Sequence, residues 1–265
     1  MASYGIVKGI ARRLGVYRQA RWFNSRVLNR AALNKEKQEF AFYRNLLRQG
    51  DLVFDVGANY GDKTRVFLQL GAKVIAFEPQ ADCRKELEAR CGKSRNLVTL
   101  GYALGSRPGR SLFFARSHKG ASGLIKSWRD DIESEFEVSI VTLDSMIKTY
   151  GRPKYIKIDV EGFEYEVLKG LSEPIPYISF EYHLEKPDGV EKTISCVEHL
   201  SRFGHLAINI TPAEDLVFPD ERWMTIEQFR QTFPVQVSSW KGFGYGDMFV
   251  RTNILVRHRK TPNPA

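Results

Sequence analysis

Two spacings of apolar residues alternate along most of the chain. Short continuous apolar runs predict buried strands, because a strand covered on both faces carries apolar side chains at successive positions. These predicted strands span residues 52–57, 73–79, 96–105, 155–162, 177–183 and 205–210. Helical spacing predicts helices over residues 36–50, 63–71, 80–92, 163–171 and 194–204. This alternation predicts an α/β fold, a mostly parallel sheet with helices on both faces.

Three further segments are strand-like. Residues 110–116 and 137–147 flank a polar loop, and residues 246–258 predict a last strand that is broken near Arg251. Ligands of parallel sheets bind beyond the carboxyl ends of the strands. We therefore expect the site at the residues that follow the strands, which are 55–61, Glu78, 104–105, 159–162 and 181–183.

The turn after the first predicted strand points to one class of ligand. Gly57 and Gly61 enclose it, but Asn59 stands where the dinucleotide fingerprint has its second glycine. Asp55, which ends the strand, would repel a pyrophosphate and would suit a cationic ligand. Glu78 ends the second strand, the usual place for an acid that binds a ribose diol. A ribose, a positive centre and no pyrophosphate together describe S-adenosylmethionine, and they disfavour NAD.

Charge divides the chain into two parts. The net charge is +9, and residues 1–35 contain eight Lys and Arg and no Asp or Glu, so the remaining residues carry a net charge of +1. We predict a basic N-terminal helical arm over residues 1–35 and a single domain over residues 36–265. The arm fits an anionic surface such as a phospholipid headgroup, a lipid-linked phosphosugar or nucleic acid, or is simply a solvated helix on the body.

Composition predicts a cytoplasmic protein, peripheral to a membrane if the arm binds one. No run approaches the roughly 18 apolar residues of a membrane span, and the first residues lack a secretory apolar core. A mitochondrial presequence is disfavoured because the arm has little Ser. Three cysteines without a CxxC pair argue against a disulfide framework or a structural zinc site.

Six blocks of the sequence resemble, in order, the signature blocks of the FkbM family of S-adenosylmethionine-dependent methyltransferases. They are GDLVFDVGANYGDKT, VIAFEPQ, YALG, VTLDSMI, YIKIDVEGFEYEVLKG and ISFEYH, within residues 38–185. The resemblance implies a Rossmann-like class I methyltransferase fold with seven strands, the last one antiparallel. It also implies methylation of an oxygen on a sugar, a polyketide or another small hydroxylated acceptor.

The resemblance also implies roles for residues of this sequence. The methionine moiety would be framed by Asp55, Gly57, Asn59 and Gly61. Glu78 would bind the ribose hydroxyls, and Tyr102 and Ala103 would lie near the adenine. The reacting centre would be faced by Asp159, Glu161, Glu181 and His183.

The last four residues suggest how an alcohol would lose its proton. Asp159 and Glu161 alternate along one strand end, as Glu181 and His183 do along the next. A general base typically contributes about 10²–10⁴-fold, and His183 or Asp159 is our candidate. The alternative is that Asp159 positions the donor's ammonium and His183 is a satisfied polar residue. The same cluster could ligate a divalent metal, since carboxylates suit Mg²⁺, but nothing in the spacing requires an ion and we do not favour one.

Two segments are candidates for contact with the acceptor. Residues 119–128 contain Ser122, whose hydroxyl would hydrogen-bond an acceptor, unless the segment is an ordinary loop. Residues 238–247 contain Trp240 and Tyr245, whose rings would stack on a sugar, unless they pack into the core beside the last strand.

Two other functions compete with methylation of a small hydroxylated acceptor. The basic arm suggests a nucleic-acid methyltransferase. The DVEG turn disfavours this reading, because it replaces the Pro-Pro-aromatic loop that holds a flipped amine, and because clustered carboxylates repel phosphates. A non-catalytic S-adenosylmethionine-binding protein is the third reading, and the intact donor turn argues against it.

Overall fold

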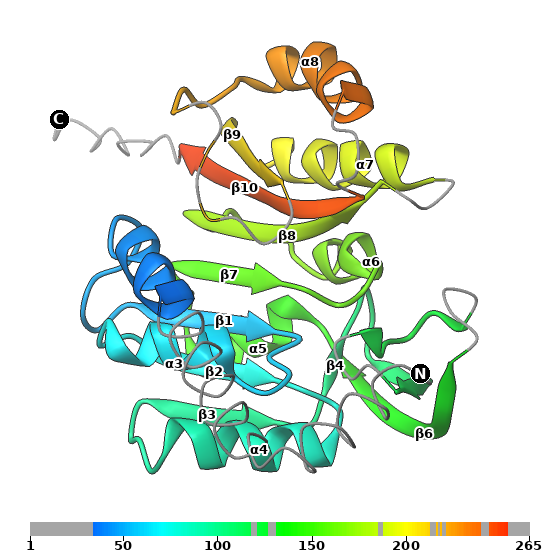
Figure 1. Ribbon diagram of the computed structural model, residues 1–265. Helices are drawn as coiled ribbons and strands as arrows, with labels where there is room; N and C mark the ends of the chain where they lie inside the picture. The colour runs from blue at the N-terminus through cyan, green and yellow to red at the C-terminus, as the bar shows by residue number, and fades with distance from the viewer. Residues whose placement is uncertain are drawn as a thin grey trace, which may run out of the picture.

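A computed structural model describes residues 34–117, 121–126, 131–184, 188–212, 216, 218, 221–239 and 244–253. A seven-stranded sheet organises the molecule, in the order β3-β2-β1-β7-β8-β10-β9 (Figure 1). The strands are β3 (Leu97–Leu100), β2 (Lys73–Phe77), β1 (Leu52–Val56), β7 (Tyr155–Ile158), β8 (Tyr177–His183), β10 (Tyr245–Asn253) and β9 (His205–Pro212).

Only one strand of this sheet runs against the others. β10 pairs antiparallel with both β8 and β9, whereas β3, β2, β1, β7 and β8 pair in parallel. The predicted class I methyltransferase fold, with an antiparallel last strand, is therefore confirmed. The predicted break in this strand is wrong, because pairing with β8 and β9 continues through Arg251 without a shift.

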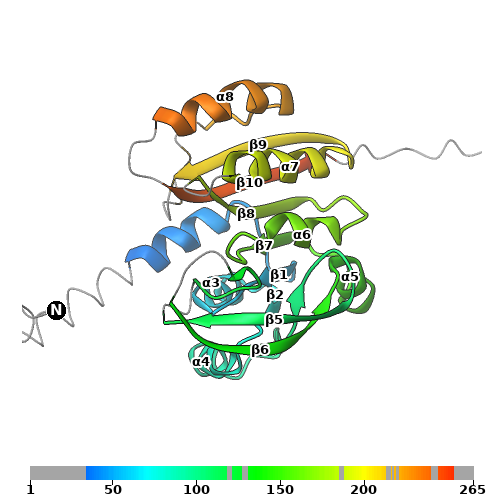
Figure 2. The ribbon, with the colours of Figure 1, turned by 90° about the vertical axis from the view of Figure 1, so that its right-hand side faces the viewer.

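Each face of the sheet carries its own apolar core. In β1, Val53 packs beside α3 (Asp62–Gln69) and α4 (Ala81–Cys91), while Phe54 and Val56 belong to the opposite core. The opposite face is covered by α5 (Leu143–Tyr150), α6 (Glu164–Lys169), α7 (Gly189–Ser201) and α8 (Ile226–Ser239). Figure 2 shows α5 and α6 on one side of the strands and the helix of residues 34–43 on the other. Helices on both faces were predicted.

A second sheet of three strands lies beside the first. Its order is β4 (Ala103–Leu104), β6 (Ile132–Val141) and β5 (Gly109–Arg116). The predicted strand over residues 96–105 is thus two strands in different sheets, with Gly101 and Tyr102 between them. This crossing puts Tyr102 at the edge of both sheets.

The predicted strand over residues 137–147 is wrong in its second half. It ends at Val141, and Thr142 begins α5 through a capping box, in which the Ser145 N–H donates to the Thr142 hydroxyl oxygen and the Thr142 N–H donates to the Ser145 hydroxyl oxygen. The helical spacing of Leu143, Met146 and Ile147 is the signal that marks this helix. Helix α8 was not predicted either.

Some of the predictions fall outside the described residues. The basic arm lies there except for its last two residues, and so does Trp240. The helix of residues 34–43 follows the arm and packs Tyr43 against Phe67 of α3, with ring centroids 4.9 Å apart. In the described residues, no helix is long and apolar enough to cross a membrane.

Candidate active site

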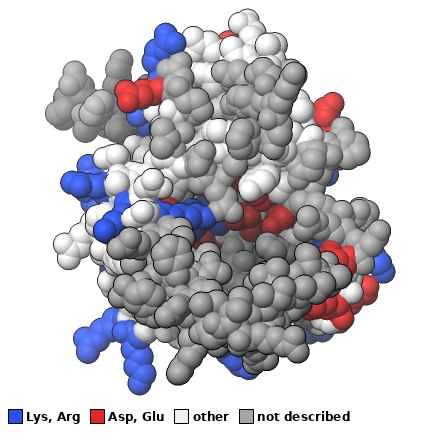
Figure 3. Space-filling view, viewed as in Figure 1, with Lys and Arg blue, Asp and Glu red and all other residues white. Residues whose placement is uncertain are grey.

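A cavity of about 650 Å³ opens at the carboxyl ends of the central strands, as the topology predicts. Its walls come from stretches that are far apart in the sequence. They include residues 56–60, 77–80, 102–104, 122–124, 159–161 and 245–247, together with Glu181. Figure 3 shows acidic side chains in the hollow of this face, beside a band of Lys and Arg.

The turn after β1 brings the backbone close to neighbouring elements. Gly57 has a φ of 79°, and a Cβ added there would lie 1.8 Å from the carbonyl oxygen of Asp159. At Gly61, with a φ of 82°, an added Cβ would lie 2.6 Å from Cγ of Leu87. Gly57 and Asn59 line the cavity, whereas Gly61 lets α3 pack closely against α4. The two glycines therefore serve different contacts.

Asp55 lies behind the cavity wall. Its carboxylate is fully buried, because its position in β1 points toward α3, and Oδ2 accepts a hydrogen bond of 2.5 Å from the Thr64 hydroxyl. Burial raises the pKa of Asp55, and the Lys157 ammonium and the Thr64 hydrogen bond partly oppose this rise. Neither Asp55 nor Thr64 lines the cavity, whereas Lys157 does, so Asp55 acts on any ligand through Lys157.

Glu78 ties the first two strands together at the cavity wall. Its Oε2 accepts from the Asn59 N–H at 2.9 Å, and Oε1 accepts from the Gln80 N–H at 2.8 Å. Burial raises the pKa of Glu78, and these N–H bonds counteract the rise. Tyr102 and Ala103 line the same part of the cavity. Five of the seven predicted donor-binding residues therefore line the cavity, and Asp55 and Gly61 do not.

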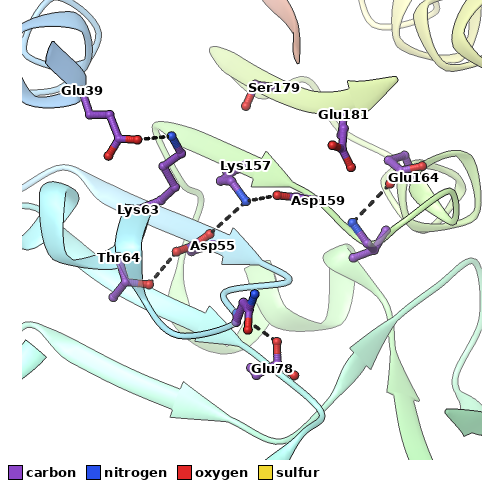
Figure 4. Close-up of polar contacts among 12 residues, drawn as sticks. Glu39, Asp55, Lys63, Thr64, Glu78, Lys157, Asp159, Glu164, Ser179 and Glu181 are labelled. Atoms are coloured by element: carbon purple, nitrogen blue, oxygen red, sulfur yellow. Dashed lines mark hydrogen bonds and ion pairs between the residues drawn. The ribbon is translucent and has the colours of Figure 1, made fainter. Parts of the chain in front are cut away.

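A buried lysine joins the two sides of the cavity. Lys157 Nζ lies 2.9 Å from Oδ2 of Asp159 and 3.9 Å from Oδ1 of Asp55, as Figure 4 shows. Burial alone would lower the pKa of Lys157, but the two carboxylates outweigh it and raise the pKa. The sequence prediction missed Lys157, although a charged residue inside the buried strand YIKI was a signal for it.

The pKa values of Asp159 and Glu181 are shifted in opposite directions. Burial acts to raise the pKa of Asp159, but the ion pair with Lys157 prevails and lowers it. The pKa of Glu181 is raised well above its usual range, first by burial and then by the carboxylates of Asp159 and Glu161. Asp159, Glu161 and Glu181 all line the cavity.

The turn after β7 is held by a residue that the sequence prediction missed. Glu164 Oε1 accepts from the N–H groups of Val160, at 3.2 Å, and Gly162, at 2.9 Å. These bonds fix Glu161 in a left-handed conformation with a φ of 59°, which is uncommon for a residue with a side chain. The acid at the start of α6, two residues beyond Gly162, was the available signal for this cap.

His183 lies next to the cavity and not on its wall. It is 6% exposed, and its Nε2 lies 3.0 Å from Oε2 of Glu181. It lines a smaller neighbouring pocket with Glu181. The structure therefore brings the four predicted catalytic residues together, with three of them exposed to the cavity.

The segment of residues 121–126 forms another part of the wall. The fully buried Arg116 donates to the carbonyl oxygens of Phe114, Ala121, Ile125 and Lys126. Ser122 lines the cavity and accepts a hydrogen bond from the Arg116 N–H at 2.9 Å. Tyr245 also lines the cavity, opposite His183 in the β8–β10 register. The loop is thus anchored by Arg116, which sequence reasoning did not single out.

Comparison of the sequence with models of protein families identifies the family of the chain. The sequence model described as the methyltransferase FkbM domain matches residues 55–209, more than half of the chain. The chain belongs to the FkbM methyltransferase family. This confirms the resemblance predicted from the sequence blocks.

A curated relative of this FkbM-family chain is the hexuronic acid methyltransferase AglP of Haloferax volcanii. The two are 29% identical over 135 residues, which are 50% of this chain and 54% of the relative. The chain therefore matches about half the length of that relative.

Solved structures resemble the FkbM-family chain distantly. The TehB-like S-adenosylmethionine-dependent methyltransferase of Corynebacterium glutamicum has a TM-score of 0.44 and 10% identity, with 89% of this chain and 98% of that chain covered. The O-methyltransferase TomG of Streptomyces achromogenes has a TM-score of 0.43 and 8% identity, with 83% and 80% covered.

Proposed function

We propose that the protein is an S-adenosylmethionine-dependent O-methyltransferase whose acceptor is a hydroxyl of a sugar or a similar small molecule. One observation carries the proposal: a single cavity joins the glycine turn and Glu78 to a cluster of carboxylates. Membership of the FkbM family supports the reaction class. The relative AglP, a hexuronic acid methyltransferase, supports a sugar-like acceptor.

The donor side of the cavity fits S-adenosylmethionine. Gly57 lets the turn after β1 pack against the backbone of Asp159 at the cavity wall, and Glu78 presents a fixed carboxylate suited to a ribose diol. The carboxylate of Asp159 favours a cationic ligand and disfavours a phosphate. When bound, S-adenosylmethionine supplies an activated methyl group.

The acceptor side must position a hydroxyl and take its proton. Positioning supplies much of the acceleration when the methyl group is already activated. Asp159 lines the cavity and His183 does not, so we assign Asp159 as the proton acceptor. Lys157 fixes the Asp159 carboxylate through its 2.9 Å ion pair. Ser122 and Tyr245, also on the wall, would contact the acceptor.

The carboxylates weigh against a nucleic-acid acceptor. Asp159, Glu161, Glu181 and Asp247 all line the cavity, and such a wall repels a phosphate backbone. For the basic arm, which is largely outside the described residues, contact with an anionic membrane surface stays a prediction. So does a cytoplasmic location.

Two measurements test the proposal. Calorimetry should detect binding of S-adenosylmethionine to the full chain in the absence of an acceptor. Incubation with methyl-labelled donor and a panel of neutral sugars, uronic acids and lipid-linked saccharides should label at least one acceptor through an alkali-stable ether. Absence of donor binding would contradict the donor assignment. Label that mild alkali releases would indicate methylation of a carboxyl group and would contradict the hydroxyl acceptor.

A further inference from the structure

Three side chains at the ends of β7 and β8 converge on one point. Glu161, Glu181 and His183 each offer one carboxylate oxygen or ring nitrogen, and these three atoms lie within 4.8 Å of one another. We infer that they bind one divalent cation, which holds the acceptor hydroxyl. The role of this cation rests on the proposed function, whereas its binding does not.

The chain holds these donors in place without a ligand. Glu181 and His183 lie two residues apart on β8 and so point to the same face. Glu161 is fixed by the turn that Glu164 caps. Oε2 of Glu181 is buried and lies 3.0 Å from Nε2 of His183. These two atoms are therefore close enough to bind the same cation.

The surrounding charge favours a cation over an anion. Besides Glu161, the carboxylates of Asp159, Glu164 and Asp247 act on Glu181. Lys157 is already shared between Asp55 and Asp159. A divalent ion would offset the remaining negative charge, which buried carboxylates tolerate poorly.

The donor set indicates the kind of ion. Carboxylates suit Mg²⁺ and Mn²⁺, and an imidazole shifts the preference toward Mn²⁺ and later transition metals. Glu161 and Glu181 line the main cavity, whereas His183 lies behind them. Coordination positions that the protein leaves free would therefore face the cavity, where the acceptor oxygen would enter.

Such an ion would make the hydroxyl a better nucleophile. A bound divalent cation lowers the pKa of an oxygen ligand. The acceptor oxygen would then form its bond to the methyl carbon of the donor while the C–S bond breaks. Its proton would go to Asp159, and the electron pair of the broken bond would stay on sulfur. No oxidation state changes, so neither an oxidant nor a reductant is needed. The sequence predicted that these side chains converge at adjacent strand ends, but its spacing did not favour a metal there.

The test uses Mn²⁺ alone as the probe. The full chain is stripped with a chelator and desalted, and Mn²⁺ is titrated in while electron paramagnetic resonance reports the free ion. We expect one saturable site per chain. Glu161→Gln and His183→Gln should each weaken its affinity by about tenfold or more. Asp62→Asn, which removes a carboxylate of the same cavity outside the donor set, is the matched control and should change affinity by less than about twofold.

Thermal unfolding checks that each variant is folded. Glu161 lies on a turn, so Glu161→Gln remains informative if His183→Gln fails to fold. Absence of saturable binding, or equal weakening by Asp62→Asn, would overturn the site. Methyl transfer should fall in excess chelator and return with Mn²⁺, and full turnover in chelator would overturn the role in acceptor activation. Donor binding without Mn²⁺ binding refutes the metal site alone, and Mn²⁺ binding without donor binding refutes the proposed function alone.

Discussion

The two sides of the cavity are built in different ways. On the side of β1 and β2, one carboxylate and several backbone N–H groups are paired within the protein: Glu78 accepts two N–H bonds, and the Gly57 and Ala58 N–H groups both donate to the Phe77 carbonyl. On the side of β7 and β8, carboxylates crowd around Glu181. The first side is a preformed cradle shaped by the backbone, whereas the second carries negative charge that a ligand would balance.

Gly57→Ala should have the largest effect on donor binding, because it distorts the turn on the preformed side of the cavity. The added Cβ would lie 1.8 Å from a carbonyl oxygen, so the turn must move. We expect donor binding to fall below detection in calorimetry and the free energy of unfolding to drop by about 3 kcal/mol. Gly50→Ala is the matched control, since Gly50 also has a positive φ but no atom near an added Cβ. It should cost about 1 kcal/mol and leave donor binding unchanged.

Asp159→Asn tests the charged side. Loss of the proton acceptor should lower the rate of methyl transfer by about 10²–10⁴-fold. The donor dissociation constant should rise by about fivefold or less, because only the attraction between the Asp159 carboxylate and the cationic donor is lost. Single-turnover kinetics with labelled donor and direct donor titration separate the two effects. A rate within threefold of the parent would remove Asp159 from the proton-transfer role.

Glu78→Gln should give a smaller effect on the preformed side. The amide replaces one acceptor oxygen with a donor, so either the Asn59 or the Gln80 N–H loses its partner. We expect about tenfold weaker donor binding, equivalent to about 1.4 kcal/mol. Asp82→Asn, an exposed carboxylate of α4, is the control and should bind the donor like the parent. If Glu78→Gln bound the donor as tightly as the parent, the assignment of Glu78 to the ribose would be wrong.

Ser122→Ala should give the smallest effect. The variant removes the hydroxyl that accepts from the Arg116 N–H and that would meet the acceptor. We expect the KM for the acceptor to rise about fivefold, in line with one hydrogen bond of about 1 kcal/mol, with kcat unchanged. Steady-state kinetics at saturating donor measure both quantities. A change in donor affinity instead would place Ser122 on the preformed side.

The sequence predicted the preformed side better than the charged side. Gly57, Asn59 and Glu78 lie on consecutive strand ends, and the local pattern of strand, turn and strand places them without knowledge of distant contacts. Lys157, Glu164 and Arg116 were missed because their roles depend on partners that only the folded chain supplies. Asp55 was placed on the wall by its motif, but strand alternation turns it toward α3.

The fold shows the same limit of local patterns. Alternating strands and helices predicted the large sheet and its covering helices. The small sheet was not predicted, because residues 96–105 form one apolar run that the structure divides between two sheets. Helix α5 was missed because the β-branched residues before Thr142 favoured a continuing strand. The capping box at Thr142 instead begins a helix.

Lys157 also has a consequence for the cooperativity of the fold. Its ammonium is almost fully buried and is shared by the ends of β1 and β7, which come from segments about 100 residues apart in the chain. If either strand end frayed alone, a charge in the interior would lose one of its two counter-ions, at a cost of several kcal/mol. The two strand ends therefore open together or stay closed together, and the floor of the cavity behaves as one unit of local unfolding.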